Sequence, residues 1–144
     1  MTASDTPNQS PADLVDRLAA ATTAHDIDAI VACFGGDYVN ETPAHPQRGF
    51  HGAEQVRRNW TQILAGVPDV TAQVLCAVVD GDTVWSEWRM SGTRRDGAPH
   101  EMCGVIIFEV VDGVARSARF YLEPVERESG SADDAVRRAV DTAP

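Results

Sequence analysis

From position 70 onward, apolar and polar residues follow one another in long runs with the period of β-strands. Four such runs are separated by three Asp-Gly pairs, each of which takes the positive φ angles of a tight hairpin turn at little cost. The runs are Val70–Val79, Thr83–Gly92, His100–Val111 and Val114–Glu123, and the pairs are Asp80-Gly81, Asp96-Gly97 and Asp112-Gly113. The pattern predicts a four-stranded antiparallel meander.

The first half of the chain has helical spacing instead. Leu14, Val15 and Leu18 form an apolar stripe behind Ser10-Pro11, which predicts a helix that begins at Pro11 with Ser10 as its N-cap. The further predicted elements are a short helix from Ile27 that ends at Gly35-Gly36, a strand over Tyr38–Thr42, a loop over Pro43–His51, and a third helix that begins at Gly52. Helices followed by a meander indicate an α+β domain with the helices on one face of a curved sheet.

The 144 residues fit one domain with tails on both sides. Residues 1–10 are polar, and we expect a disordered N-terminal tail there. The domain is expected over residues 11–124. Residues 125–144 are polar again, and Ser131 is expected to cap a short helix over Ala132–Val140.

Charge and cysteine usage narrow the partners and the compartment. The net charge is −10 and the basic residues are scattered, which argues against nucleic acid and anionic membrane surfaces as partners. No apolar stretch is long enough to span a membrane, and the N-terminus lacks the pattern of a signal peptide. Cys33, Cys76 and Cys103 lack CxxC spacing, so we expect reduced core thiols and a cytoplasmic location.

Three short motifs carry a resemblance to a known family. They are Ala32-Cys33-Phe34 followed by Asp37-Tyr38-Val39, the loop Pro46–Glu54, and Val111-Asp112-Gly113-Val114-Ala115 leading to Phe120-Tyr121-Leu122-Glu123. In this order the chain resembles the nuclear transport factor 2-like superfamily, and within it the SnoaL-like, polyketide cyclase-like branch. The resemblance implies a cone: a mostly antiparallel curved sheet against three N-terminal helices, around a pocket for small, largely apolar molecules. It also implies a tendency to dimerise.

The catalytic positions of characterised relatives hold unsuitable residues here. By this resemblance, the acid and base of the SnoaL-like cyclases fall at Ile106 and Phe120. The Arg and first Asp of limonene-epoxide hydrolase fall at Trp88 and Met90, and the base of ketosteroid isomerase falls near Thr42. We therefore predict a protein that binds a small apolar or aromatic molecule without these acid–base groups, and we expect no cofactor and no metal.

Strand alternation assigns residues to the two faces of the sheet. The predicted ligand pocket contains Tyr38, Trp60, Ser86, Trp88, Met90, Ile106, Phe108, Phe120 and Leu122. We call the opposite side the outer face; its predicted residues are Trp85, Glu87, Arg89, Val105, Ile107, Glu109, Arg119, Tyr121 and Glu123. This mixture favours a homodimer interface in which Arg89 or Arg119 pairs with Glu87 or Glu123, the alternative being a solvated face.

Two alternative functions stay open. The first is an enzyme of the cyclase, isomerase, dehydratase or hydrolase type, with His45 or His51 at the pocket mouth as a general base oriented by Glu41. The same histidines are more typical of an exposed loop, and with Glu41 they match no familiar metal-site spacing. The second alternative is an accessory dimeric protein whose core is simply filled.

Overall fold

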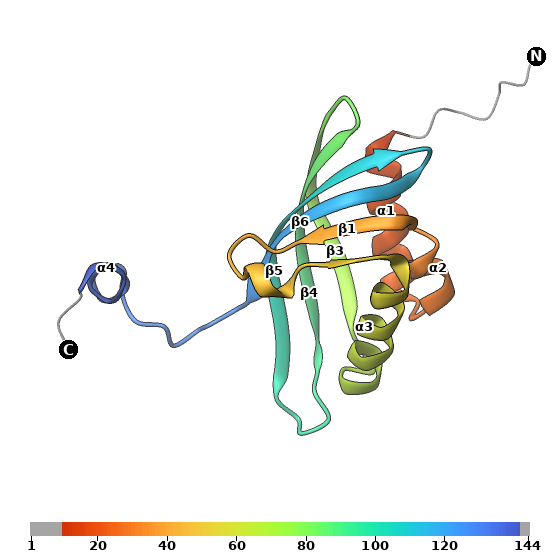
Figure 1. Cartoon of the computed structure of the whole chain (residues 1–144). Helices are drawn as coiled ribbons and strands as arrows, with labels where there is room; N and C mark the ends of the chain where they lie inside the picture. Colours follow the sequence, from red (N-terminus) through yellow and green to blue (C-terminus); the bar gives the residue numbers. More distant parts are fainter. Residues whose placement is uncertain (1–9, 142–144) are drawn as a thin grey trace, which may run out of the picture.

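The computed structural model describes residues 10–141 (Figure 1). The disordered tail predicted for residues 1–10 therefore lies almost entirely outside the described residues. In chain order the elements are α1 (Pro11–Thr23), α2 (Ile27–Val31), β1 (Phe34–Glu41), the 3₁₀ turn η1 (Pro46–Arg48), β2 (Phe50–His51), α3 (Ala53–Gly66), β3 (Thr71–Asp80), β4 (Thr83–Thr93), β5 (Pro99–Val111), β6 (Val114–Pro124) and α4 (Ala132–Val140).

The six strands form one curved, mixed sheet in the order β2-β1-β6-β5-β4-β3. Strands β3 to β6 pair antiparallel with their chain neighbours, so the predicted meander is confirmed. Strand β1 joins the other edge of the meander, parallel to β6, and β2 pairs antiparallel with β1. Helices α1, α2 and α3 lie on one side of this sheet in Figure 1, which confirms the α+β architecture.

The turn between β5 and β6 has the predicted backbone. Asp112 has a φ of 53° and Gly113 a φ of 78°. Positive φ at both central residues is what a type I′ turn requires, and its twist matches that of the two strands. The last hairpin is therefore set by its own two turn residues.

The predicted end of the second helix is wrong. Helix α2 ends at Val31, and Gly35-Gly36 lies inside strand β1, which begins at Phe34. Two contacts outweigh the helical spacing there: the Phe34 ring packs edge-on against Tyr38 at a centroid distance of 4.7 Å, and the Ala115 N–H donates to the Cys33 carbonyl at 2.8 Å. These contacts tie the segment to β6 and to the core. The predicted loop over Pro43–His51 likewise contains η1 and β2.

The ion pairs expected on the outer face do not form within residues 10–141. In the sheet register, Arg89 lies opposite Gln73 and Cys103, and Arg119 lies opposite Ile107. Neither Glu87 nor Glu123 therefore lies directly across from either arginine, and the carboxylate in register with Arg119 is that of Glu41 on β1. Ile107, which was predicted to lie on the outer face, is buried. The prediction of core thiols is wrong for Cys76 and Cys103, which are exposed.

Helix α4 stands apart from the domain in Figure 1. Ser131 caps it in a capping box with Asp134, and every residue of the helix is exposed. Across residues 10–141, no helix combines the length and apolar character needed to cross a membrane.

Candidate ligand pocket

A cavity of about 450 Å³ lies between strand β1, helix α3 and the neighbouring ends of β4, β5 and β6. This volume is within the range of pockets that bind small molecules, about 300–1,000 Å³. Its lining consists of Phe34, Tyr38, Asn40, Thr42, Arg48, Phe50, Val56, Asn59, Trp60, Ile63, Met90, His100, Met102, Phe120, Leu122 and Glu123.

The walls of the cavity are mainly apolar and aromatic. Tyr38 forms the centre of one wall, with the Phe34 ring at 4.7 Å and the Phe50 ring at 6.0 Å between centroids, both edge-on. A second wall is formed on the neighbouring strands, where Phe120 of β6 packs edge-on against Phe108 of β5 at 6.3 Å between centroids. Edge-to-face rings at these distances attract one another beyond their buried area, so both walls are held in defined positions.

Five of the nine residues predicted for the pocket line this cavity: Tyr38, Trp60, Met90, Phe120 and Leu122. The other four, Ser86, Trp88, Ile106 and Phe108, are at most 1% exposed and lie outside the lining. They are on the same face of the sheet, but helix α1 packs on β4 and β5 there and fills the space. Strand alternation therefore identified the correct face of the sheet, but it did not distinguish the residues that line the cavity from those that are buried under α1.

The hydroxyl of Ser86 is committed to the core and faces no cavity. It accepts a hydrogen bond from Trp88 Nε1 at 2.8 Å and donates one to the Ile106 carbonyl at 2.7 Å. These bonds satisfy the indole N–H and the hydroxyl, both of which are buried. Ser86 is thus a structural partner of Trp88.

The residues proposed for acid–base chemistry are only partly brought together. His45 Nε2 lies 3.0 Å from Glu123 Oε1, and not beside Glu41 as predicted. Glu41 is exposed on β1 in register with Arg119, and His51 is exposed on β2, so neither lines the cavity. Alternation assigned Glu123 to the outer face, but it lines the cavity; it lies at the end of β6, next to Pro124.

Several polar residues of the lining were not predicted as pocket residues. They are Asn40, Thr42, Arg48, Asn59 and His100. Asn40 had a usable signal, since it lies two residues after Tyr38 on one strand and therefore on the same face. Arg48 lies in η1 and His100 at the start of β5. At such positions the period of the sequence does not show which way a side chain points. Within residues 10–141, no cluster of three or more His, Cys, Asp and Glu residues could hold a metal ion.

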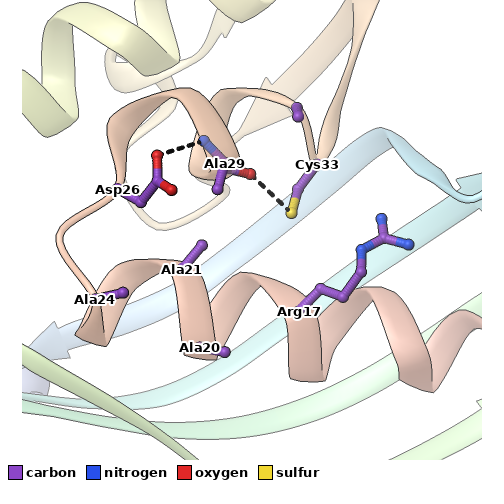
Figure 2. A pocket seen from close by; sticks show the side chains of 8 residues that line it. Arg17, Ala20, Ala21, Ala24, Asp26, Ala29 and Cys33 are labelled. Atoms are coloured by element: carbon purple, nitrogen blue, oxygen red, sulfur yellow. Dashed lines mark hydrogen bonds between the residues drawn. The ribbon is translucent and has the colours of Figure 1, made fainter.

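A second hollow, of about 530 Å³, lies between α1 and α2 and is lined mostly by alanines (Figure 2). Its polar groups already have partners: Asp26 accepts from the Ala29 N–H at 3.0 Å, the Cys33 thiol donates to the Ala29 carbonyl at 3.5 Å, and Arg17 donates to the Gly113 carbonyl at 2.7 Å. Burial raises the pKa of Cys33, which favours the unreactive thiol. This hollow therefore offers little to a polar ligand.

Comparison with known proteins agrees with the fold. The model of the SnoaL-like domain matches residues 15–118. A search of curated proteins finds no significant match. Among solved structures, IdmH from Streptomyces antibioticus, named as a candidate polyketide cyclase, is 24% identical, covers 79% of this chain and 92% of its own, and has a TM-score of 0.66.

Two proteins of Mycobacterium tuberculosis share the fold as well. RV0760c, solved with estradiol-17beta-hemisuccinate, is 21% identical, with 78% of this chain and 94% of its own covered and a TM-score of 0.68. An LEH-like epoxide hydrolase is 19% identical, with 78% and 82% covered and a TM-score of 0.67. Because the family model spans most of the chain and these structures share its α+β cone, the protein belongs to the SnoaL-like domain family of the nuclear transport factor 2-like fold.

Proposed function

We propose that this protein binds one small, predominantly apolar or aromatic molecule in the cavity between β1, α3 and the ends of β4–β6. The observation that carries the proposal is the cavity itself: about 450 Å³, with aromatic walls from Phe34, Tyr38, Phe50, Trp60 and Phe120. An open cavity argues against the alternative of a filled core. The steroid ester bound by RV0760c, which has the same fold, supports a ligand of this kind.

The lining favours ligand binding without the acid–base chemistry of the characterised relatives. Met90 and Phe120 stand at two of the positions aligned with catalytic residues, and both line the cavity. Ile106 and Trp88, at two others, are buried in the core. Thioether, phenyl, sec-butyl and indole groups cannot transfer a proton at neutral pH. Of the pair His45 and Glu123, only Glu123 lines the cavity.

Calorimetric titration with 2-ethylnaphthalene tests the proposal. We expect saturable binding of one molecule per chain, with a negative heat-capacity change because apolar surface is buried. Titrations at three temperatures give that heat-capacity change. Absence of binding up to the solubility limit of the probe would contradict the proposed function.

We also propose that the outer face of the sheet forms a homodimer interface. Trp85 is 51% exposed and Val78, its neighbour in register on β3, is 60% exposed; Leu75 and Tyr121 add further apolar surface to this face or its edge. Exposed apolar area of this kind typically marks an interaction site. The three helices of the domain cover the other side of the sheet and leave this one open (Figure 1).

Replacing Trp85 with glutamate is expected to raise the dimer dissociation constant by about 30-fold or more, because a buried interface tryptophan is typically a binding hot spot. Sedimentation equilibrium measures the constant. The control is Gln62→Glu, which makes the same charge change at an exposed site on α3 and should leave the constant unaltered. A weak interface has a dissociation constant of roughly 100 μM. If the wild-type protein stays monomeric at about that concentration, the proposed dimer is wrong.

A further inference from the structure

The polar side chains that reach the cavity have directions fixed by their neighbours. Asn59, on α3, is the clearest case. Arg58 carries only donors, and its guanidinium donates to Gln55 Oε1. The other end of that amide, Gln55 Nε2, then donates to Asn59 Oδ1 at 2.8 Å. Because this chain occupies the oxygen of Asn59, its amide nitrogen Nδ2 is the group left for a molecule in the cavity.

The side-chain amide of Asn40, on β1, is oriented in the same way, with its oxygen occupied and its nitrogen left for a ligand. The Tyr38 hydroxyl donates to Asn40 Oδ1 at 2.7 Å. Burial raises the pKa of Tyr38 well above its usual range, so the phenol keeps the proton that it donates. Asn40 Nδ2 reaches Thr42 Oγ1 only at 3.4 Å, the long limit for a hydrogen bond. Asn40 is 7% exposed and lines the cavity, so a nearly buried N–H group is available there.

The charged groups of the lining agree with this direction. The guanidinium of Arg48 has five donors and no acceptor, and it makes no ion pair or hydrogen bond within residues 10–141. Oε1 of Glu123, the one carboxylate of the lining, is engaged by His45 Nε2 at 3.0 Å, which leaves Oε2 able to accept. His100 can donate or accept. Asn40, Asn59 and Arg48 therefore give the cavity several donors that can meet a ligand, beside the acceptors Glu123 Oε2 and the Thr42 hydroxyl.

We propose that the cavity selects aromatic molecules that carry a carbonyl oxygen, recognised by the amide nitrogens of Asn40 or Asn59. This inference rests on the proposed function, since it names the class of ligand that the apolar cavity takes. An aryl ketone, aldehyde or carboxylate supplies the acceptor that these donors lack. A hydrocarbon of the same shape leaves them unpaired, and so does an arylalkylammonium ion, which has no acceptor to offer them.

Three probes of nearly equal shape test the selection by calorimetry: 2-acetylnaphthalene with an acceptor, 2-ethylnaphthalene with neither group, and 2-naphthylmethylamine with donors only. For the wild-type protein we expect the ketone to bind about tenfold more tightly than the hydrocarbon, as one or two hydrogen bonds allow. The amine should bind more weakly than the ketone, because it offers these donors no acceptor.

Two variants assign the selection to the amides. Asn59→Leu removes the donor on α3, and the double variant Tyr38→Phe with Asn40→Leu removes the other one without leaving the buried phenol unpaired. At least one of them should lower the ketone-to-hydrocarbon affinity ratio by about fivefold, the size expected for one hydrogen bond. The control Gln62→Leu, at an exposed position of the same helix outside the lining, should keep the wild-type ratio.

The outcomes separate this inference from the proposed function. Equal affinities of the wild-type protein for ketone and hydrocarbon, or a preference retained in both variants, would overturn the inference while the binding function stands. Failure of all three probes to bind would overturn both.

Discussion

Replacement of Gly104 with alanine is expected to lower the free energy of unfolding by about 3 kcal/mol. Gly104 lies in β5 with a φ of 147°, a conformation that residues with a side chain rarely adopt. A Cβ atom there would lie 2.0 Å from the Tyr121 carbonyl oxygen and 2.9 Å from the Leu122 Cα, and both are backbone atoms. A backbone cannot rotate away as a flexible side chain does, so β5 and β6 must separate.

Urea denaturation followed by tryptophan fluorescence measures this loss. The matched control is Gly36→Ala in β1, where a Cβ would have no atom within 4 Å. That variant should be as stable as the wild type, or more stable by up to about 1 kcal/mol, because alanine restricts the unfolded chain. Equal unfolding free energies for Gly104→Ala and the wild type would show that the strands are not held at this separation.

The second large effect is expected for Phe120→Asp, in the wall of the cavity. Phe120 lines the cavity and packs edge-on against Phe108. A carboxylate there would be partly buried in a mainly apolar and aromatic wall, so we expect the affinity for 2-ethylnaphthalene to fall by more than about tenfold. The variant Phe120→Leu, which keeps the wall apolar, should lose no more than a few-fold, and calorimetry measures both.

The stability of Phe120→Asp should also depend on pH in a defined direction. Burial raises the pKa of a carboxyl group in the folded state above its unfolded value of about 3.9. The folded state then binds more protons than the unfolded state, so stability relative to the wild type is greatest below about pH 4 and falls as the pH rises through the folded-state pKa. A stability difference that is constant from about pH 3.5 to 7 would place residue 120 in solvent.

The meander was predictable because its signals are local. Asp112-Gly113 forms a two-residue turn, and Gly81 and Gly97 take the positive φ angles of the other two connections, of which the second runs from the end of β4 at Thr93 to Pro99. Alternation then assigns the two faces of every strand. The beginning of β1 was not predictable in this way. Phe34 has the spacing of α2, but its ring belongs beside Tyr38, and its strand pairs with β6 about 80 residues later in the chain. No short window of sequence contains that contact.

The sequence predicted which face of the sheet the cavity lies on, but not how far the cavity extends over that face. Alternation placed Phe108 and Phe120 on the same face of the sheet, but it cannot show that α1 fills the space above Trp88 and leaves it open above Phe120. That difference depends on where helices end against the sheet. The free donors of Asn40 and Asn59 depend on hydrogen bonds to particular neighbours, so they required coordinates.

The most direct test of ligand binding in this cavity uses the methionine methyl groups. The sequence has three methionines; Met90 and Met102 line the cavity, and Met1 lies outside the described residues. In NMR spectra of protein labelled with ¹³C at the methionine methyls, added 2-ethylnaphthalene should shift the resonances of Met90 and Met102 together, because its rings would lie against both. Saturable binding by calorimetry with unmoved Met90 and Met102 resonances would contradict the account, because the ligand would then be bound elsewhere.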